Sequence, residues 1–317
     1  MDRHELDAFK RANFLAYAAW LGYSLDKRES SKNSAVMRHP DGDKIIITRK
    51  PDGVYTFWSV RDDRTHGTII DLAKHRKGLN LGAIRKELRG WMGLAAVALP
   101  TYPALSPTTK DRFRVEREYA KMQDALRHPY LETERGIPAE WLVGDRIASR
   151  IRIDAQGNAV FPHFDQDGLC GFEKKNTAFT GFSSGGTKGL WLSHTQPDDE
   201  RFVFSESTID ALSYAVLFPD EHTRYASVGG KLNAAQPELI RAAIARMPSD
   251  AEIVAAFDAD QAGRDLAEIV RRAVELSGRS DLRFRVHEPV GFKDWNDQLR
   301  AKPKRSLPFR PEAPSVA

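Results

Sequence analysis

Short apolar runs that end in carboxylates constrain the fold of this 317-residue chain more than any other feature. Residues 202–205 lead into Glu206, and residues 253–257 lead into Asp258 and Asp260. Each run is too short for a helix, is typical of a buried strand, and is followed by a helix-like segment. This alternation predicts an open parallel sheet, in which the carboxyl ends of the strands meet at one edge. We therefore expect the three acids to lie close together.

Clustered carboxylates indicate a particular chemistry. Like charges raise each other's pKa unless a cation lies between them. Oxygen ligands suit Mg²⁺, which usually reaches a phosphate substrate through one or two carboxylates. The acids therefore predict metal-dependent chemistry on phosphates. The local alternative is that they cap helices or occupy turns, where Asp is favoured.

Four segments around these acids carry a resemblance to a known family. In chain order they are residues 204–212 (FSESTIDAL), 227–231 (SVGGK), 257–263 (FDADQAG) and 293–297 (KDWND). Together they resemble the Toprim domain, the metal-binding domain of bacterial primases, type IA and II topoisomerases and certain nucleases. The resemblance implies an α/β fold. Its C-terminal Toprim domain would be an open, mainly parallel sheet with helices on both faces, preceded by small α+β domains.

The resemblance also implies roles for individual residues. The expected ligands of Mg²⁺ or Mn²⁺ are Glu206, Asp258, Asp260, Asp210 and Asp294, with Asp297 as an alternative to Asp294. The expected catalytic residues are Glu206, Asp258, Asp260 and Lys231, with Arg264 as a second candidate for stabilising phosphate charge. Glu206 either binds metal or handles the proton of the attacking hydroxyl. Gly229, Gly230 and Lys188 are expected on the cofactor-binding side of the site.

The first part of the chain shows a second resemblance. A helix over residues 6–21, a hairpin across residues 45–58 and a helix starting at Gly67-Thr68 follow one another. This order resembles the N-terminal zinc-binding domain of bacterial primases, but Cys170 is the only cysteine, so no structural zinc is expected. The histidines of this region are predicted to be scattered on the surface: His39, His66 and His75. An apolar core must then replace the metal, with Phe57, Trp58, Ile46, Ile70 and Leu72 as candidates.

The basic surplus of the chain lies in its first third. Residues 1–110 contain 19 Lys/Arg against 12 Asp/Glu, whereas the whole chain has a formal net charge of only +4. Cations interleave there with Tyr55, Phe57 and Trp58, as in surfaces that bind single-stranded nucleic acid. Strand alternation places Trp58 on the face opposite to the other two aromatics, and one face must be core. An ordinary solvated surface is the alternative.

The chain is expected to divide at its prolines. The predicted parts are a zinc-less primase-type domain (1–93), a Pro-rich linker (94–110), a middle α+β primase-like domain (111–197), the Toprim domain (198–301) and a disordered tail (302–317). In the middle domain, the glycine-rich residues 181–191 with Lys188 form either a phosphate cradle or a mobile hairpin turn. The nearly chain-long resemblance is to a poorly characterised group of plasmid and mobile-element proteins.

Three functions remain open at this point. The motif order favours a primase-like nucleotidyltransferase that uses NTPs and Mg²⁺ on single-stranded DNA, in replication or transfer of a plasmid or mobile element. A Toprim nuclease and a non-catalytic DNA-binding accessory protein are the alternatives. A helicase or relaxase of the same element is an expected partner, since no helicase P-loop is present. The sequence has no membrane-length apolar stretch and no signal-peptide pattern, which predicts a cytoplasmic protein without a membrane partner.

Overall fold

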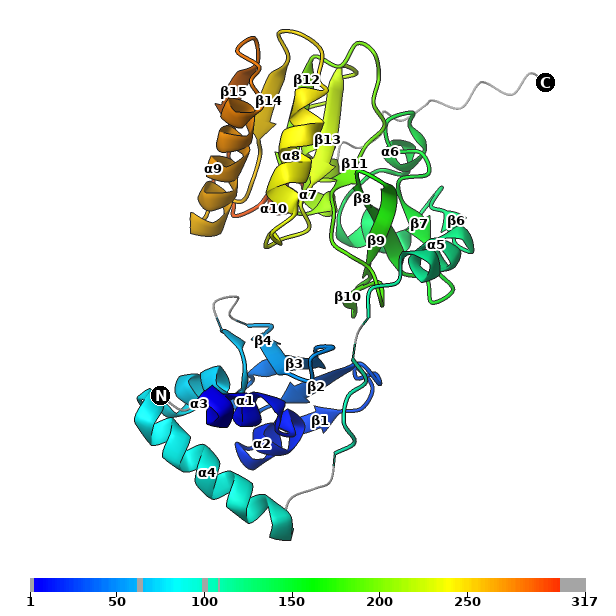
Figure 1. The fold of residues 1–317 in the computed structure, drawn as a ribbon. Coiled ribbons are helices and arrows are strands. Elements are labelled where there is room, and N and C mark those ends of the chain that lie inside the picture. Colours follow the sequence, from blue (N-terminus) through cyan, green and yellow to red (C-terminus); the bar gives the residue numbers. More distant parts are fainter. Residues whose placement is uncertain (1–2, 62–64, 99–101, 108, 303–317) are drawn as a thin grey trace, which may run out of the picture. The chain divides into compact units, whose positions relative to one another are not determined.

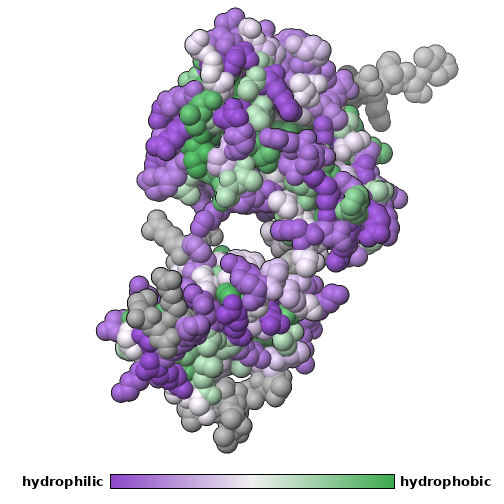
Figure 2. Space-filling view, in the orientation of Figure 1, coloured by the Kyte–Doolittle hydropathy of each residue, from purple (hydrophilic) through white to green (hydrophobic). Residues whose placement is uncertain are grey.

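The chain forms two compact units in the computed structural model, Met1–Thr109 and Lys110–Ala317 (Figure 1). The structure describes residues 3–61, 65–98, 102–107 and 109–302. Residues 303–317 of the expected tail lie outside this part. Within it, no helix is long and apolar enough to cross a membrane. Figure 2 shows a mostly hydrophilic face with small hydrophobic patches.

The first unit is an antiparallel sheet covered by helices. The sheet order is β1-β2-β3-β4-β5. The elements are α1 (Arg3–Arg11), α2 (Phe14–Trp20), β1 (Ser24–Asp26), β2 (Ser34–Arg38), β3 (Lys44–Arg49), β4 (Tyr55–Ser59), β5 (His66–Gly67), α3 (Ile69–Lys77) and α4 (Leu81–Ala98). The expected first helix is two helices, because the side chain of Asn13 accepts a hydrogen bond from the Ala16 amide and starts a new one. Thr68 caps α3 as predicted, in a capping box with Asp71.

Strand alternation decides which aromatic residues of this unit are core. Tyr55 and Phe57 are buried on the face of β4 that meets the helices. Trp58 points to the other face and is 42% exposed, so its prediction as a core residue was wrong. There it lies between Ile46 and His66 on the neighbouring strands. The sheet therefore presents one open face with an exposed tryptophan.

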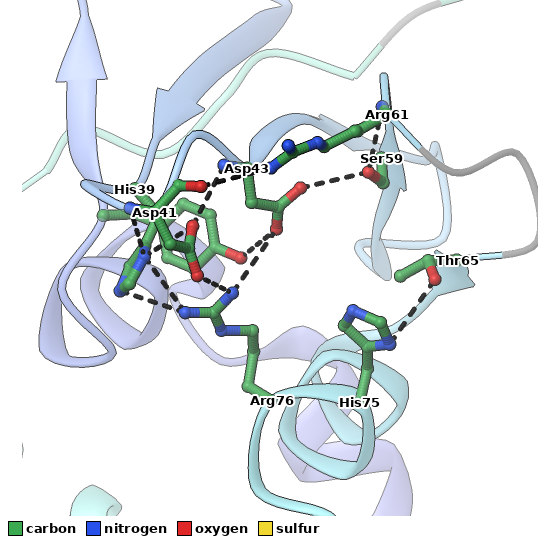
Figure 3. A network of polar contacts seen from close by, with 9 residues as sticks. His39, Asp41, Asp43, Ser59, Arg61, Thr65, His75 and Arg76 are labelled. Atoms are coloured by element: carbon green, nitrogen blue, oxygen red, sulfur yellow. Dashed lines mark hydrogen bonds and ion pairs between the residues drawn. The ribbon is translucent and has the colours of Figure 1, made fainter.

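A polar network joins α3 to the loop between β2 and β3 (Figure 3). Asp43 is buried, accepts hydrogen bonds from the Tyr23 hydroxyl and the Ser59 hydroxyl, and lies 3.9 Å from Arg76. Arg76 also binds Asp41 at 2.8 Å and stacks over the Tyr23 ring. These hydrogen bonds and ion pairs supplement the apolar core that the sequence predicts.

His39 differs from the prediction of scattered surface histidines. It is partly buried, lies 2.8 Å from an Asp41 oxygen and contacts the Arg76 guanidinium in the same network (Figure 3). His66 and His75 are exposed as predicted.

Helix α4 corrects the start of the expected linker. It continues to Ala98, five residues into the segment predicted as linker from residue 94. Residues 94–98 (LAAVA) contain no proline or glycine, so nothing in them ends a helix before Pro100.

The second unit contains two sheets. Its first, antiparallel sheet has the order β10-β9-β8-β7-β6. The elements up to this point are α5 (Arg112–Ala120), β6 (Gln123–Asp124), the π-helix η1 (Tyr130–Glu134), α6 (Ala139–Val143), β7 (Arg152–Ile153), β8 (Ala159–Asp165), β9 (Gly168–Lys175) and β10 (Thr180–Phe182).

The second sheet is the mainly parallel sheet that the acidic runs predict. Its order is β11-β13-β12-β14-β15, and only β11 is antiparallel to its neighbour. The elements are β11 (Trp191–Leu192), β12 (Arg201–Ser205), α7 (Thr208–Leu217), β13 (Thr223–Ser227), α8 (Gln236–Ala245), β14 (Glu252–Ala255), α9 (Gln261–Leu276), β15 (Arg283–Val286) and α10 (Trp295–Ala301). Helices α8 and α9 cover one face, and α7 and α10 cover the other (Figure 1).

The expected middle domain and Toprim domain share one hydrophobic core. Leu131 and Phe161 of the middle segment belong to the same buried cluster as Leu212 of α7 and Trp295 of α10. Asn296 of α10 also donates a 2.7 Å hydrogen bond to the backbone carbonyl of Arg135. Residues 111–301 therefore form a single unit.

Candidate active site

The acids predicted to cluster come from four separate places in the sheet. Glu206 follows β12, Asp258 follows the neighbouring parallel strand β14, and Asp210 lies in the first turn of α7. Asp294 precedes α10, which starts after β15. Burial, together with the negative charges of Asp210, Glu206 and Asp294, raises the pKa of Asp258 to about 8. The four carboxylates thus share one electrostatic environment at the carboxyl edge of the sheet.

Two of the predicted metal ligands also serve as helix caps. The Asp260 carboxylate accepts a 3.0 Å hydrogen bond from the Gly263 amide at the start of α9. The Asp294 carboxylate accepts a 2.7 Å hydrogen bond from the Asp297 amide at the start of α10. The local alternative, helix capping, is therefore true for both residues. In these hydrogen bonds, capping uses one oxygen of each carboxylate.

The carboxylate of Asp258 has an unsatisfied oxygen. Its Oδ1 atom is buried and has no hydrogen-bond partner within the described residues. Gly263 lets the start of α9 lie close to the backbone of Asp258, because a Cβ there would lie 2.0 Å from the Asp258 carbonyl oxygen. A buried oxygen without a donor is costly, and a cation would satisfy it.

The donor set fits a hard divalent cation in its chemistry, since all the donors are carboxylate oxygens. In the described part of the chain, however, no three His, Cys, Asp or Glu side chains are already placed to ligate one metal ion. The carboxylates are close enough to raise the pKa of Asp258, but their side chains would have to turn toward a bound ion.

Lys293 is a basic neighbour of this cluster to which the sequence analysis gave no role. Its ammonium lies 3.7 Å from an Asp260 oxygen. Burial lowers the pKa of Lys293, but the charges of Asp258, Asp260, Glu206 and Asp294 outweigh this effect, so the pKa is raised. Its position directly before Asp294 in the KDWND segment was the available signal.

The predicted Gly229-Gly230 turn lies beside Glu206. Both glycines have positive φ, 69° and 77°, and the Gly230 amide donates to the Glu206 carbonyl at 2.9 Å. A Cβ on Gly229 would lie 2.8 Å from the His163 ring and 3.2 Å from the Glu173 carboxylate. The turn therefore fits directly against side chains of β8 and β9.

Lys188 ties the glycine-rich segment to this turn. Its ammonium donates to the backbone carbonyl of Lys231 at 2.6 Å, and its own carbonyl accepts from the Asn233 amide group at 2.8 Å. Burial lowers the pKa of Lys188, while Glu173 and Glu206 oppose that shift. Lys188, Gly229 and Gly230 are thus brought together beside Glu206, with Lys231 exposed at the end of the turn.

Other basic residues lie in different surroundings. Lys174 binds Asp154 at 3.0 Å, and Arg152 binds Asp124 at 3.1 Å. Arg264 is exposed and contacts Gln261 on its own helix.

Two buried residues beside the turn were missed by sequence reasoning. His163 is 0% exposed, its Nδ1 atom is 2.8 Å from the Gly189 carbonyl oxygen, and its Nε2 atom has no partner among the described residues. The Oε2 atom of Glu173 has no hydrogen-bond partner among the described residues, although the Lys175 ammonium lies 3.5 Å from that oxygen. Burial raises the pKa of Glu173, but Lys175, His163 and Lys188 lower it below the usual value. The available signals were a histidine directly after the apolar run 159–162 and a glutamate directly after the apolar run 169–172.

Comparison with known families agrees with this arrangement. Residues 203–299 match the family described as Toprim-like. Residues 129–199 match the family described as a protein of unknown function, DUF3991. The chain thus carries a DUF3991 region followed by a Toprim-like domain. No protein with curated annotation matches the sequence.

Solved primase structures show a limited likeness. The primase fragment of the bacteriophage T7 primase-helicase protein is 18% identical over 64% of this chain and 78% of that one, with a TM-score of 0.37. A DNA primase domain from Pseudomonas aeruginosa is 20% identical over 49% of each chain, with a TM-score of 0.35. TM-scores below 0.5 do not establish a shared arrangement of domains.

Proposed function

We propose that the protein is a primase-like nucleotidyltransferase that acts on single-stranded DNA with Mg²⁺ or Mn²⁺. The observation that carries the proposal is the unsatisfied, buried oxygen of Asp258 within a cluster of four carboxylates. Such a cluster is stable in its charged form only with a cation. A Toprim-like domain provides this cluster in enzymes that act on phosphodiesters, which is why phosphoryl chemistry is the reaction class we infer.

Asp258, Glu206, Asp210 and Asp294 are the residues that would hold the ion, with Asp260 at the rim. A divalent cation held there supplies charge neutralisation and alignment of the reacting phosphate. Glu206 lies at the strand end beside the cluster, where it would either bind the ion or accept the proton of the attacking hydroxyl. Lys293 and Lys188 would bring positive charge to the acids, where phosphate oxygens develop negative charge.

The first unit would hold the template. Its open sheet face offers Trp58 for stacking with a base, and this part of the chain carries the basic surplus. A partner helicase would be needed for unwinding duplex DNA.

The test is incubation of the full chain with single-stranded DNA, labelled NTPs and Mg²⁺ or Mn²⁺. The expected result is NTP incorporation into short products, lost in Glu206→Gln and retained in Glu238→Gln. Glu238 is a suitable control because it is an exposed acid of α8 that pairs with Arg241. Loss of template without NTP incorporation would instead establish a nuclease. DNA binding with neither activity would leave an accessory role.

A further inference from the structure

A cluster of arginines lies on the Toprim-like sheet, away from the acidic edge. Arg224 is the second residue of β13, opposite Phe202 of β12, whereas the acids follow the carboxyl ends of the strands. The ladder between β11 and β13 pairs Leu192 with Ala226, and the Ser193 amide continues it with a 2.9 Å bond to the Tyr225 carbonyl. This register puts His194 next to Arg224, on the sheet face that α8 and α9 cover.

Arg224 is a buried cation without a partner. It is 8% exposed, and its guanidinium lies 4.6 Å above the Phe202 ring. Within the described residues the Arg224 side chain makes no hydrogen bond or ion pair. Its Nε atom is buried and has no hydrogen-bond partner.

Arg150 approaches the same place from the middle segment. Its guanidinium lies 4.8 Å above the ring of Phe164, which bridges to Leu190, two residues before Leu192. Its Nη2 atom is 3.4 Å from His194 Nδ1, and its Nε atom is buried without a partner in the described part of the chain. His194 Nε2 is 2.8 Å from the Ala148 carbonyl oxygen and donates its hydrogen to it. The His194 ring therefore supplies no negative charge to balance the arginines.

Little negative charge balances these cations. Asp199, the acid whose charge acts on Arg224, is fully buried and is already bound by Arg146 and by the Gln196 amide. Burial lowers the pKa of Arg224 to about 10. Asp199 opposes this shift, and the positive charges of Arg150, Arg246 and Arg146 contribute to it. Burial also lowers the pKa of Arg150. Buried charges are normally paired, so two arginines without carboxylates indicate an anion that comes from outside the chain.

We propose that Arg150 and Arg224, with the exposed Arg246 at the end of α8, bind a phosphate group. The planar guanidinium group can donate two parallel hydrogen bonds to phosphate oxygens. Arg246 is exposed and would bind the phosphate from the solvent side of the site. The phosphate belongs either to a nucleic-acid strand or to a free polyphosphate. The site uses none of the acids at the sheet edge, so it stands or falls independently of the proposed catalysis.

The first test measures binding of the full chain to labelled dT20 over a range of salt concentrations. Arg150→Gln and Arg246→Gln should each weaken binding about tenfold. Each should also reduce the salt slope by about 0.7. Arg241→Gln is the matched control, because Arg241 lies on the same helix and is paired with Glu238. Thermal stabilisation by sodium tripolyphosphate, present in wild type and absent in Arg150→Gln, would assign the site to a free anion if dT20 binding does not change. Variants that match Arg241→Gln in both measurements would overturn the proposal.

The second test asks whether Arg224 is structural. Arg224→Met keeps the apolar stem and removes the charge. In phosphate-free buffer this variant should unfold at the same temperature as wild type or higher, and it should lose stabilisation by the anion identified above. A clear fall in unfolding temperature together with unchanged anion binding would show that Arg224 only supports the fold, and would overturn its part in the site.

Discussion

The ammonium of Lys188 donates a 2.6 Å hydrogen bond to the backbone carbonyl of Lys231. The bond joins the glycine-rich segment before β11 to the turn after β13. It explains why the segment lies against the site: Lys188 is held by the turn rather than presented on a mobile hairpin. The contact gives the segment a fixed attachment to the turn, and the phosphate cradle stays a prediction.

The raised pKa of Asp258 predicts a pH dependence of stability in metal-free, chelated buffer. Its folded-state pKa is about 8, against about 4 in an unfolded chain. Between these values the folded state binds more protons than the unfolded state, so the free energy of unfolding should fall as pH rises. Asp258→Asn should remove this component of the urea-unfolding profile. Asp265→Asn, an exposed acid on α9, should keep it.

Metal binding should be visible in the same variants. We expect weak Mn²⁺ binding by calorimetry in the wild type, with Mg²⁺ restoring the stability lost at pH 8. Asp258→Asn should reduce Mn²⁺ affinity at least tenfold while the circular dichroism spectrum is unchanged. Equal Mn²⁺ affinity in wild type and Asp258→Asn would refute the assignment of the metal site.

Gly229 and Gly230 form a matched pair for testing the turn. Both have positive φ, so alanine at either costs about 1–2 kcal/mol in backbone strain. Only at position 229 would the new Cβ also meet His163 at 2.8 Å, since nothing lies within 4 Å of a Cβ at position 230. Gly229→Ala should therefore destabilise the protein more than Gly230→Ala and lower NTP incorporation. Equal unfolding free energies of Gly229→Ala and Gly230→Ala would show that the turn does not pack against His163 of β8.

Trp58 should contribute to binding of single-stranded DNA. Stacking with one base is worth about 1–3 kcal/mol, so Trp58→Ala should weaken dT20 binding by about 5- to 150-fold. Trp20 is the control, being 38% exposed but stacked on Tyr17 and covered by Lys77. If Trp20→Ala and Trp58→Ala bind equally well, the open sheet face is not the template surface.

Sequence reasoning succeeded where the signal was local. The strands before Glu206 and Asp258 are short and apolar throughout, and their positions predict the acidic edge correctly. It failed for Trp58, because alternation separates two faces of a strand but does not say which face meets the helices. It missed His163 and Glu173 because their importance depends on Gly229, a residue far along the chain that meets them only after folding. Arg224 was missed for the same reason.

The core shared by the DUF3991 region and the Toprim-like domain has a consequence for dividing the protein. Two sequence families meet near residue 200, yet Phe161 and Trp295 lie in the same buried cluster. A cut at that family boundary would expose the apolar surface of both halves to water. The two matched regions are therefore expected to fold as one cooperative unit. A fragment that contains this unit should be made by cutting near Thr109.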